Sequence, residues 1–170
     1  MKIWIIQTGE PLHFDGGALR KMRAMNLADF LISRGHEVVI YSTTFNHTLK
    51  KQRFVKTSEI KINRQLSYVL IKSPGYKRNI SIGRLVDHAI LALNFRLYLN
   101  RSDIVLPDAV FVGYPPVSLS FISLRWLYKK KVFSILDLKD RWPDIFEAAL
   151  PIYLRTLSRL VLWPSYFMRN

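Results

Sequence analysis

The sequence predicts an α/β fold built on a doubly wound parallel sheet. Short apolar runs alternate with longer stretches of helical periodicity, as in chains that form parallel sheets. The apolar run 2–6 leads into a polar loop at 11–17, and the run 132–136 leads into another at 137–144. Since parallel strands end at the sheet edge where ligands bind, these two loops are predicted to be walls of one site.

In the first part of the chain we expect a strand at 2–7, a helix at about 18–34 and a strand at 37–42. Apolar residues recur at helical spacing in the helix, and Gly35 directly after Arg34 supplies a left-handed stop. The second strand lacks alternation, as expected of a strand covered on both faces. Residues 43–66 are basic with few apolar anchors, which favours a mobile basic loop, with a solvated connector as the alternative.

The rest of the chain is expected to form strands at 67–72, 108–113 and 131–136, and helices at about 81–99, 117–129 and 144–162. The last of these helices carries an apolar stripe between Leu150 and Val161, with Arg155 and Arg159 off it. This stripe is expected to pack on the sheet, lie on a membrane or dock on a further domain. The chain has no internal repeat, and 170 residues suit one domain.

The charge balance points to an anionic partner. There are 26 lysine and arginine residues against 12 acidic ones, a formal charge of +14, which fits nucleic acid, anionic lipid or phosphorylated substrates. In residues 95–101 the basic side chains are interleaved with aromatic and aliphatic ones, which favours a membrane surface over nucleic acid. No apolar run is long enough for a signal peptide or a membrane span, so membrane contact is predicted to be peripheral. The absence of cysteine excludes disulfides and thiolate chemistry.

The first loop has the features of a phosphate-binding turn. Gly16 and Gly17 let a ligand approach the backbone next to a helix N-terminus, and Arg20 can reach a phosphate. The spacing is not that of a dinucleotide fingerprint. The alternative is a plain strand-to-helix turn with two permissive glycines.

The second loop carries candidate catalytic groups. Asp137 and Asp140 lie beside Arg141 and Trp142, a combination suited to hydroxyl recognition or to general-base work. A metal site receives little support, because magnesium usually needs substrate phosphates in addition to carboxylates. The alternative is structural: Asp144 caps the last helix and Asp137 binds loop amides.

Arg84 and His88 lie one helical turn apart and share a helix face. As an isolated pair they can equally be a surface pair or a satisfied core pair. The four histidines of the chain show no metal-ligand spacing, so no metal site is predicted. No Gly-x-Ser-x-Gly element supports nucleophilic hydrolysis.

Several of these stretches occur in order along the whole chain: residues 5–12, 15–17 with Arg20 and Arg23, 34–38, 45–53, 79–88, 107–108 and 137–144. Jointly they resemble the N-terminal domain of family 4 glycosyltransferases of GT-B fold. The resemblance is to the bacterial group of O-antigen and capsule synthesis that includes N-acetylfucosamine transferases. It implies a Rossmann-like domain over 1–170 that holds the acceptor, and a C-terminal donor-binding domain that this sequence does not contain.

The resemblance also implies an activity: retaining transfer of a sugar from a nucleotide-sugar to a polyprenyl-diphosphate-linked acceptor, in the cytoplasm at the inner face of the cell membrane. No cofactor is implied beyond the nucleotide-sugar donor. The residues that would carry this activity are Asp137 and Asp140 for catalysis, Gly16, Gly17 and Arg20 for the donor diphosphate, and His13, Arg84, His88, Arg141 and Trp142 for the acceptor. Lys139 stands where arginine is common in this group, and it keeps the charge without the bidentate fork.

Three alternatives stay open. The chain can be a subunit that a separate donor-domain chain completes, or a non-catalytic membrane-binding remnant of such an enzyme. A small basic nucleic-acid-binding protein is the third, and it has no motif in its support.

Overall fold

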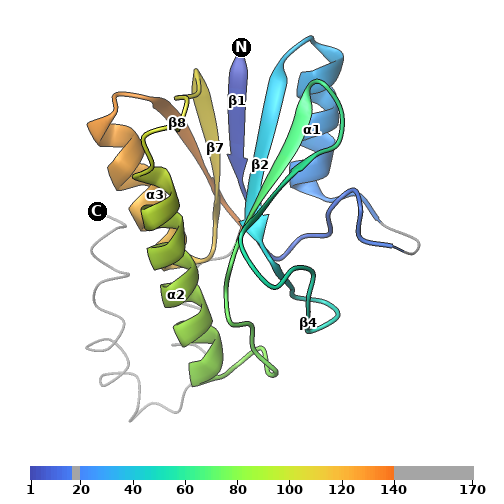
Figure 1. The fold of residues 1–170 in the computed structure, drawn as a ribbon, viewed down its shortest axis with the longest axis vertical. Coiled ribbons are helices and arrows are strands. Elements are labelled where there is room, and N and C mark those ends of the chain that lie inside the picture. The colour runs from blue at the N-terminus through green and yellow to red at the C-terminus, as the bar shows by residue number, and fades with distance from the viewer. Residues whose placement is uncertain (17–19, 140–170) are drawn as a thin grey trace.

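The computed structural model describes residues 1–16 and 20–139, and within them the fold is mixed α/β. A six-stranded, mostly parallel sheet lies between helices on its two faces (Figure 1). The predicted α/β class is therefore confirmed. The helix expected at 144–162 lies outside the described residues.

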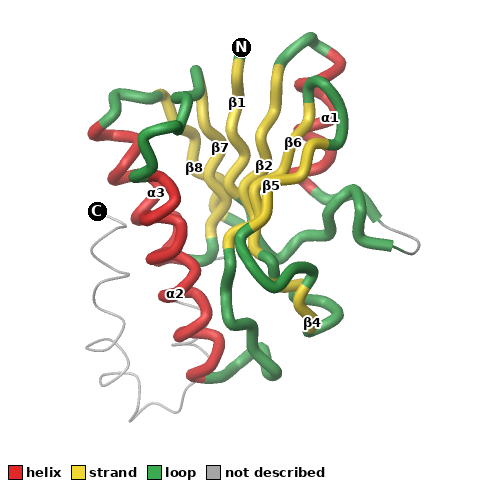
Figure 2. The backbone as a smooth tube through the Cα atoms, viewed as in Figure 1, coloured by secondary structure: helices red, strands yellow, loops and turns green. Residues whose placement is uncertain are grey.

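The sheet has the strand order β5-β6-β2-β1-β7-β8 (Figure 2). Its parallel strands are β1 (Lys2–Ile6), β2 (Glu37–Thr43), β6 (Leu66–Ile71), β7 (Ala109–Tyr114) and β8 (Phe133–Leu138). Counted in chain order, these five run 3-2-1-4-5 across the sheet, as in Rossmann-like folds. The direction of winding reverses between β1 and β7, where ligands bind in such sheets.

Three helices pack on the sheet in the described part of the chain: α1 (Arg23–Ser33), α2 (Ile82–Leu99) and α3 (Val117–Lys129). Helix α1 covers one face, where Ala24 and Ala28 pack against Ile5 and Val38. Helices α2 and α3 cover the other. Ser81 caps α2 by accepting the N–H of Arg84 at 3.2 Å.

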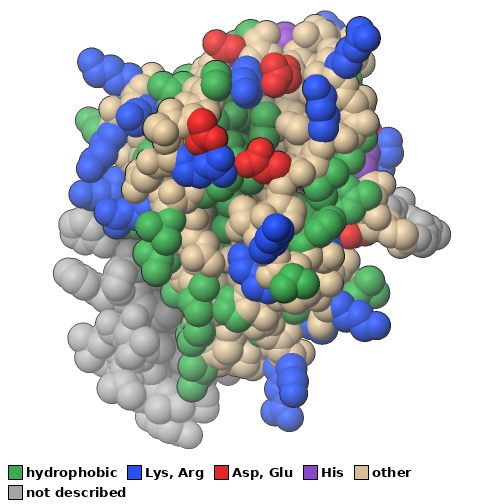
Figure 3. Space-filling view, viewed as in Figure 1, with side chains coloured by type: hydrophobic (Ala, Val, Ile, Leu, Met, Phe, Trp, Pro, Cys, Tyr) green, Lys and Arg blue, Asp and Glu red, His purple; other side chains and the backbone are tan. Residues whose placement is uncertain are grey.

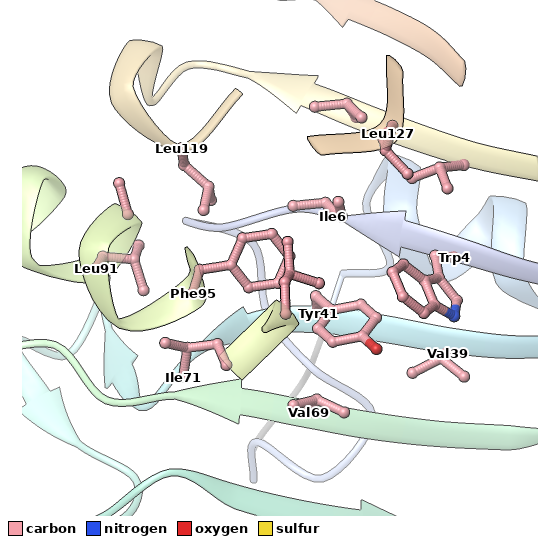
Figure 4. Packing of buried hydrophobic residues seen from close by; sticks show 14 residues of the cluster. Trp4, Ile6, Val39, Tyr41, Val69, Ile71, Leu91, Phe95, Leu119 and Leu127 are labelled. Carbon is pink, nitrogen blue, oxygen red and sulfur yellow. The ribbon is translucent and has the colours of Figure 1, made fainter. Parts of the chain in front are cut away.

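The core under α2 and α3 is aromatic at its centre (Figure 4). The Trp4 and Tyr41 rings lie 4.8 Å apart, and Phe95 of α2 meets Tyr41 edge-on at 5.4 Å. All three side chains are at most 4% exposed. Such packing fixes α2, and with it the part of the site that α2 carries.

Residues 43–66 are more ordered than the sequence predicts. They contain the hairpin β3 (Phe45–Asn46) and β4 (Lys51–Gln52), followed by β5 (Ser58–Lys61), which pairs antiparallel with β6 at the sheet edge. The expectation of a mobile loop is wrong, because the sequence analysis did not recognise two residues that anchor this segment. Phe45 is buried, and Arg53 forms an ion pair with Asp15. The sheet is not wholly parallel, because β5 pairs antiparallel with β6.

Two element boundaries also differ from the prediction. Helix α1 begins at Arg23, later than the expected start near residue 18, and β8 extends through Leu138. Asp137 therefore lies on the last strand and not in the loop that follows it.

Candidate functional site

A cavity of about 200 Å³ opens beyond the carboxyl ends of β1 and β7, where the winding of the sheet reverses. Residues 7–10 after β1 and Pro115 and Pro116 after β7 line it from the sheet side. Thr43 of β2 and Lys139 after β8 complete this wall. The position is the one at which open parallel sheets hold their ligands.

Helix α2 supplies the opposite wall with Arg84, Asp87, His88 and Leu91. Asp87 is 3% exposed and accepts the N–H of Gly75 at 2.6 Å. This bond fixes the loop before α2 to the helix. The pair Arg84 and His88, selected from the sequence because the two residues share a helix face, thus lines the cavity.

Tyr76 connects this helix to the β3–β4 hairpin, and sequence reasoning missed it. Its hydroxyl lies 2.5 Å from Nδ1 of His47, and Nζ of Lys50 stands 4.5 Å above its ring centre. The guanidinium of Arg84 and the ring of His88 contact the same ring at 5.6 and 6.2 Å. One sequence signal pointed to Tyr76: it follows a buried strand, as the two predicted loops do.

Burial and neighbouring cations keep both histidines of this cluster neutral near pH 7. Burial, with Arg84 and His47 nearby, lowers the pKa of His88 from 6.5 to about 4. Burial together with Lys50 and Arg84 lowers the pKa of His47. Neutral imidazoles donate and accept hydrogen bonds, so the cavity combines hydroxyl-binding groups with the positive charge of Arg84, and Lys50 adds a second positive charge next to its wall, over Tyr76.

Gln7 adds a further polar group to the cavity. Its side chain is 4% exposed and its Nε2 donates to the carbonyl of Thr8 at 2.7 Å. Its Oε1 has no hydrogen-bond partner among the described residues. A buried acceptor of this kind is a candidate for a ligand hydroxyl, because leaving it unpaired is costly. Gly113 permits this arrangement, since a Cβ there would lie 1.7 Å from Oε1.

The end of β8 contacts residues on either side of the first predicted wall. Glu10, which is 6% exposed, accepts the N–H of Ala24 at 2.9 Å and pairs with Lys139. Arg23 at the start of α1 donates to both oxygens of Asp137, at 2.8 and 3.0 Å. The end of β8 is therefore joined by charge to the loop after β1 and to α1.

A second hollow of about 680 Å³ lies beside α1, lined by Gly16, Arg20, Lys21 and Arg23 among others. This places the predicted residues Gly16 and Arg20 together on a basic surface. A Cβ at Gly16 would meet nothing within 4 Å, so the described residues place no steric demand for glycine there. Gly17 lies outside the described residues.

His13 lies apart from both hollows. Its Nδ1 meets the hydroxyl of Tyr68, and its Nε2 lies 3.1 Å from Asp29 of α1. The structure thus gives His13 a contact role between the first loop and α1, with no place in the cavity. Asp140, Arg141 and Trp142 lie outside the described residues.

The described residues contain no group of three or more His, Cys, Asp or Glu side chains placed to hold a metal ion. None of the helices in residues 1–16 and 20–139 is long and apolar enough to cross a membrane. No protein-family model matches the chain, and a search of curated proteins finds no match.

Proposed function

We propose that this chain is the acceptor-binding part of a retaining glycosyltransferase of GT-B fold. The observation that carries the proposal is the cavity between β1, β7 and α2, whose lining joins hydroxyl-binding groups to Arg84, with Lys50 next to it over the ring of Tyr76. An acceptor sugar on a polyprenyl diphosphate offers hydroxyls and negative charge to match. Gln7, His47 and His88 would bind the sugar, while Lys50 and Arg84 would face the phosphates.

The donor would lie on the neighbouring basic hollow. Arg20 and Lys21 are exposed there beside Gly16, and the charge of this surface suits the diphosphate of a nucleotide-sugar. The nucleotide itself would be held by a donor-binding domain, either in a longer polypeptide or in a partner chain. This assignment places donor and acceptor at the same edge of the sheet, beyond the carboxyl ends of its parallel strands.

Asp137 and Asp140 are the proposed catalytic carboxylates. Arg23 holds the carboxylate of Asp137, which fixes its orientation at the end of β8. The proposed place of action is the inner face of the cell membrane, with the protein in the cytoplasm and bound peripherally.

The test is sugar transfer by the full polypeptide that the native reading frame encodes. Host membranes supply lipid-linked acceptors, and a panel of radiolabelled UDP-, GDP- and dTDP-sugars supplies donors. We expect label in the solvent-extractable lipid fraction with at least one donor. If no donor gives labelled lipid, even after candidate donor-domain chains are added, the proposal is refuted and a non-catalytic remnant is favoured.

A pair of arginine variants links transfer to the cavity. Arg84→Ala should lower transfer about 10–100-fold, the loss expected when a charge-assisted hydrogen bond to substrate is removed. Arg64→Ala is the matched control, since Arg64 is exposed just before β6, at the opposite edge of the sheet, and does not line the cavity. Equal activities of the two variants would contradict the assignment of the cavity.

A further inference from the structure

Helix α2 is apolar on two opposite faces. One face carries Leu91, Phe95 and Leu99 into the core. The other carries side chains at a spacing of three or four residues that remain exposed, a set we call the α2 strip: Ile82 (79% exposed), Leu85 (53%), Val86 (47%), Leu93 (54%) and Leu97 (61%). Figure 3 shows apolar side chains gathered along this helix.

An exposed apolar strip of this kind indicates a surface that binds a partner. A helix on the surface of a soluble domain normally presents polar residues to water, and contiguous exposed apolar surface marks an interaction site. Ser81 caps the helix and Phe95 and Leu99 anchor it, so local folding does not require aliphatic residues on its outer side. The strip therefore has a use other than holding the fold together.

Between residues 77 and 97 the exposed charges are of one sign. Lys77 and Arg78 are exposed directly before α2, and Arg96 is exposed near its end. Asp87 is the only acidic residue between positions 77 and 97 of the sequence, and it is buried against the N–H of Gly75. An aliphatic strip with basic residues at both ends, on a segment without an exposed carboxylate, complements a surface of hydrocarbon under negative headgroups.

We propose that the α2 strip is the surface by which this domain lies on an anionic lipid bilayer. In this arrangement α2 lies along the membrane plane, its Ile, Leu and Val side chains enter the boundary between headgroups and acyl chains, and Lys77, Arg78 and Arg96 contact phosphates. The strip is a contact surface and not a span. The interaction requires no activity and no second domain.

One consequence rests on the proposed function. Arg84 and His88 line the cavity from the inner face of α2, at the same level along the helix as Leu85 and Val86 of the strip on its outer face. With the strip on the bilayer, the cavity would lie about one helix diameter, roughly 10 Å, from the lipid surface. A lipid-linked acceptor would then reach it without leaving the membrane.

The test is co-sedimentation of the purified chain with vesicles of phosphatidylcholine, with and without 30% phosphatidylglycerol. We expect binding to the anionic vesicles that weakens as salt is added. Leu93→Glu should lower the partition coefficient about tenfold or more, since it places a charge where an apolar side chain would enter the bilayer. Phe30→Glu is the matched control: Phe30 is 55% exposed on α1, on the opposite face of the sheet.

Two further measurements distinguish lipid binding from contact of the α2 strip with a second protein molecule. Lys77→Ala and Arg78→Ala should each lower binding to anionic vesicles roughly fivefold, with retained helix content by circular dichroism. The proposal is overturned if the wild-type chain does not sediment with anionic vesicles, or if Leu93→Glu and Phe30→Glu bind equally. It is also overturned if light scattering shows a dimer that Leu93→Glu converts to a monomer, because a second copy would then cover the strip. Vesicle binding without sugar transfer would leave this inference intact while refuting the proposed function.

Discussion

Asp15 and Arg53 form an ion pair that holds the first loop to the β3–β4 hairpin. Nε of Arg53 donates to Oδ1 of Asp15 at 2.6 Å and Nη2 donates to Oδ2, and both side chains are only 8% exposed. Nη1 of the same guanidinium donates to the carbonyls of Thr43 and Phe45, at 3.3 and 2.9 Å. The charge is thus buried and depends on Asp15 for its compensation.

Asp15→Asn keeps the shape of the side chain and removes its charge. The guanidinium stays buried without a counter-charge, which costs about 3–5 kcal/mol when one partner of such a pair is lost. For a domain of this size each kcal/mol shifts the melting temperature by about 2–4 °C, so a fall of about 6–20 °C is expected. His47 and Lys50 belong to the tethered hairpin, so the cavity should loosen as well.

The assay is urea unfolding followed by far-ultraviolet circular dichroism. Asp103→Asn is the control, because Asp103 pairs with Arg101 in an exposed position and its loss should leave the unfolding midpoint unchanged. Replacing both buried partners, Asp15→Leu with Arg53→Met, should recover most of the lost stability. A single Asp15→Asn variant within about 1 kcal/mol of the wild type would refute the reasoning, since that is the value of a surface pair.

Three further predictions concern the cavity. Gly113→Ala should lower the free energy of unfolding by about 1–3 kcal/mol and reduce sugar transfer, because its Cβ would displace Gln7; unfolding and transfer assays check it. Burial, followed by Arg84, lowers the pKa of His88 from 6.5 to about 4, so the folded state should lose stability as pH falls through that interval. Unfolding titrations at several pH values measure this loss, and His88→Gln should remove part of it; an identical pH profile in the variant would contradict the assignment. Glu10→Gln keeps an acceptor for the α1 backbone but loses the charge that faces Lys139, and should cost about 1–3 kcal/mol by the same unfolding assay.

The sequence predicted the five parallel strands and the helices between them because their signals are local. Val38, Val39 and Ile40 form an apolar run without alternation, and both faces of β2 are indeed covered. β5 was not predicted because it is a short strand at the sheet edge. Its four residues alternate between intermediate and exposed side chains, and none of them is buried. Only its pairing with β6 identifies it as a strand.

The site was predictable in outline and not in detail. The rule that parallel strands end at one edge predicted that the loops after β1 and β8 lie close together. The Glu10–Lys139 pair joins the loop after β1 to the first residue after β8, and the rest of the second predicted loop lies outside the described residues. The position of Tyr76 after a buried strand was readable, but its contacts with His47 and Lys50 were not, because they depend on a loop that folds back to the hairpin. His13 had the same appearance in the sequence as a site residue, yet its ring is engaged by Tyr68 and Asp29.

The sequence by itself determined the class of fold, the sheet edge at which the candidate site lies and the strong positive charge of the chain. Each follows from spacing and composition along the chain. Tertiary structure decided the electrostatics: which carboxylates are held by arginine, which histidines stay neutral and which apolar side chains of α2 remain exposed. These properties depend on burial and on distances between segments far apart in sequence, such as Asp15 and Arg53 or His47 and Tyr76. The protonation state and the contacts of these side chains therefore depend on their neighbours in space more than on their neighbours in the chain.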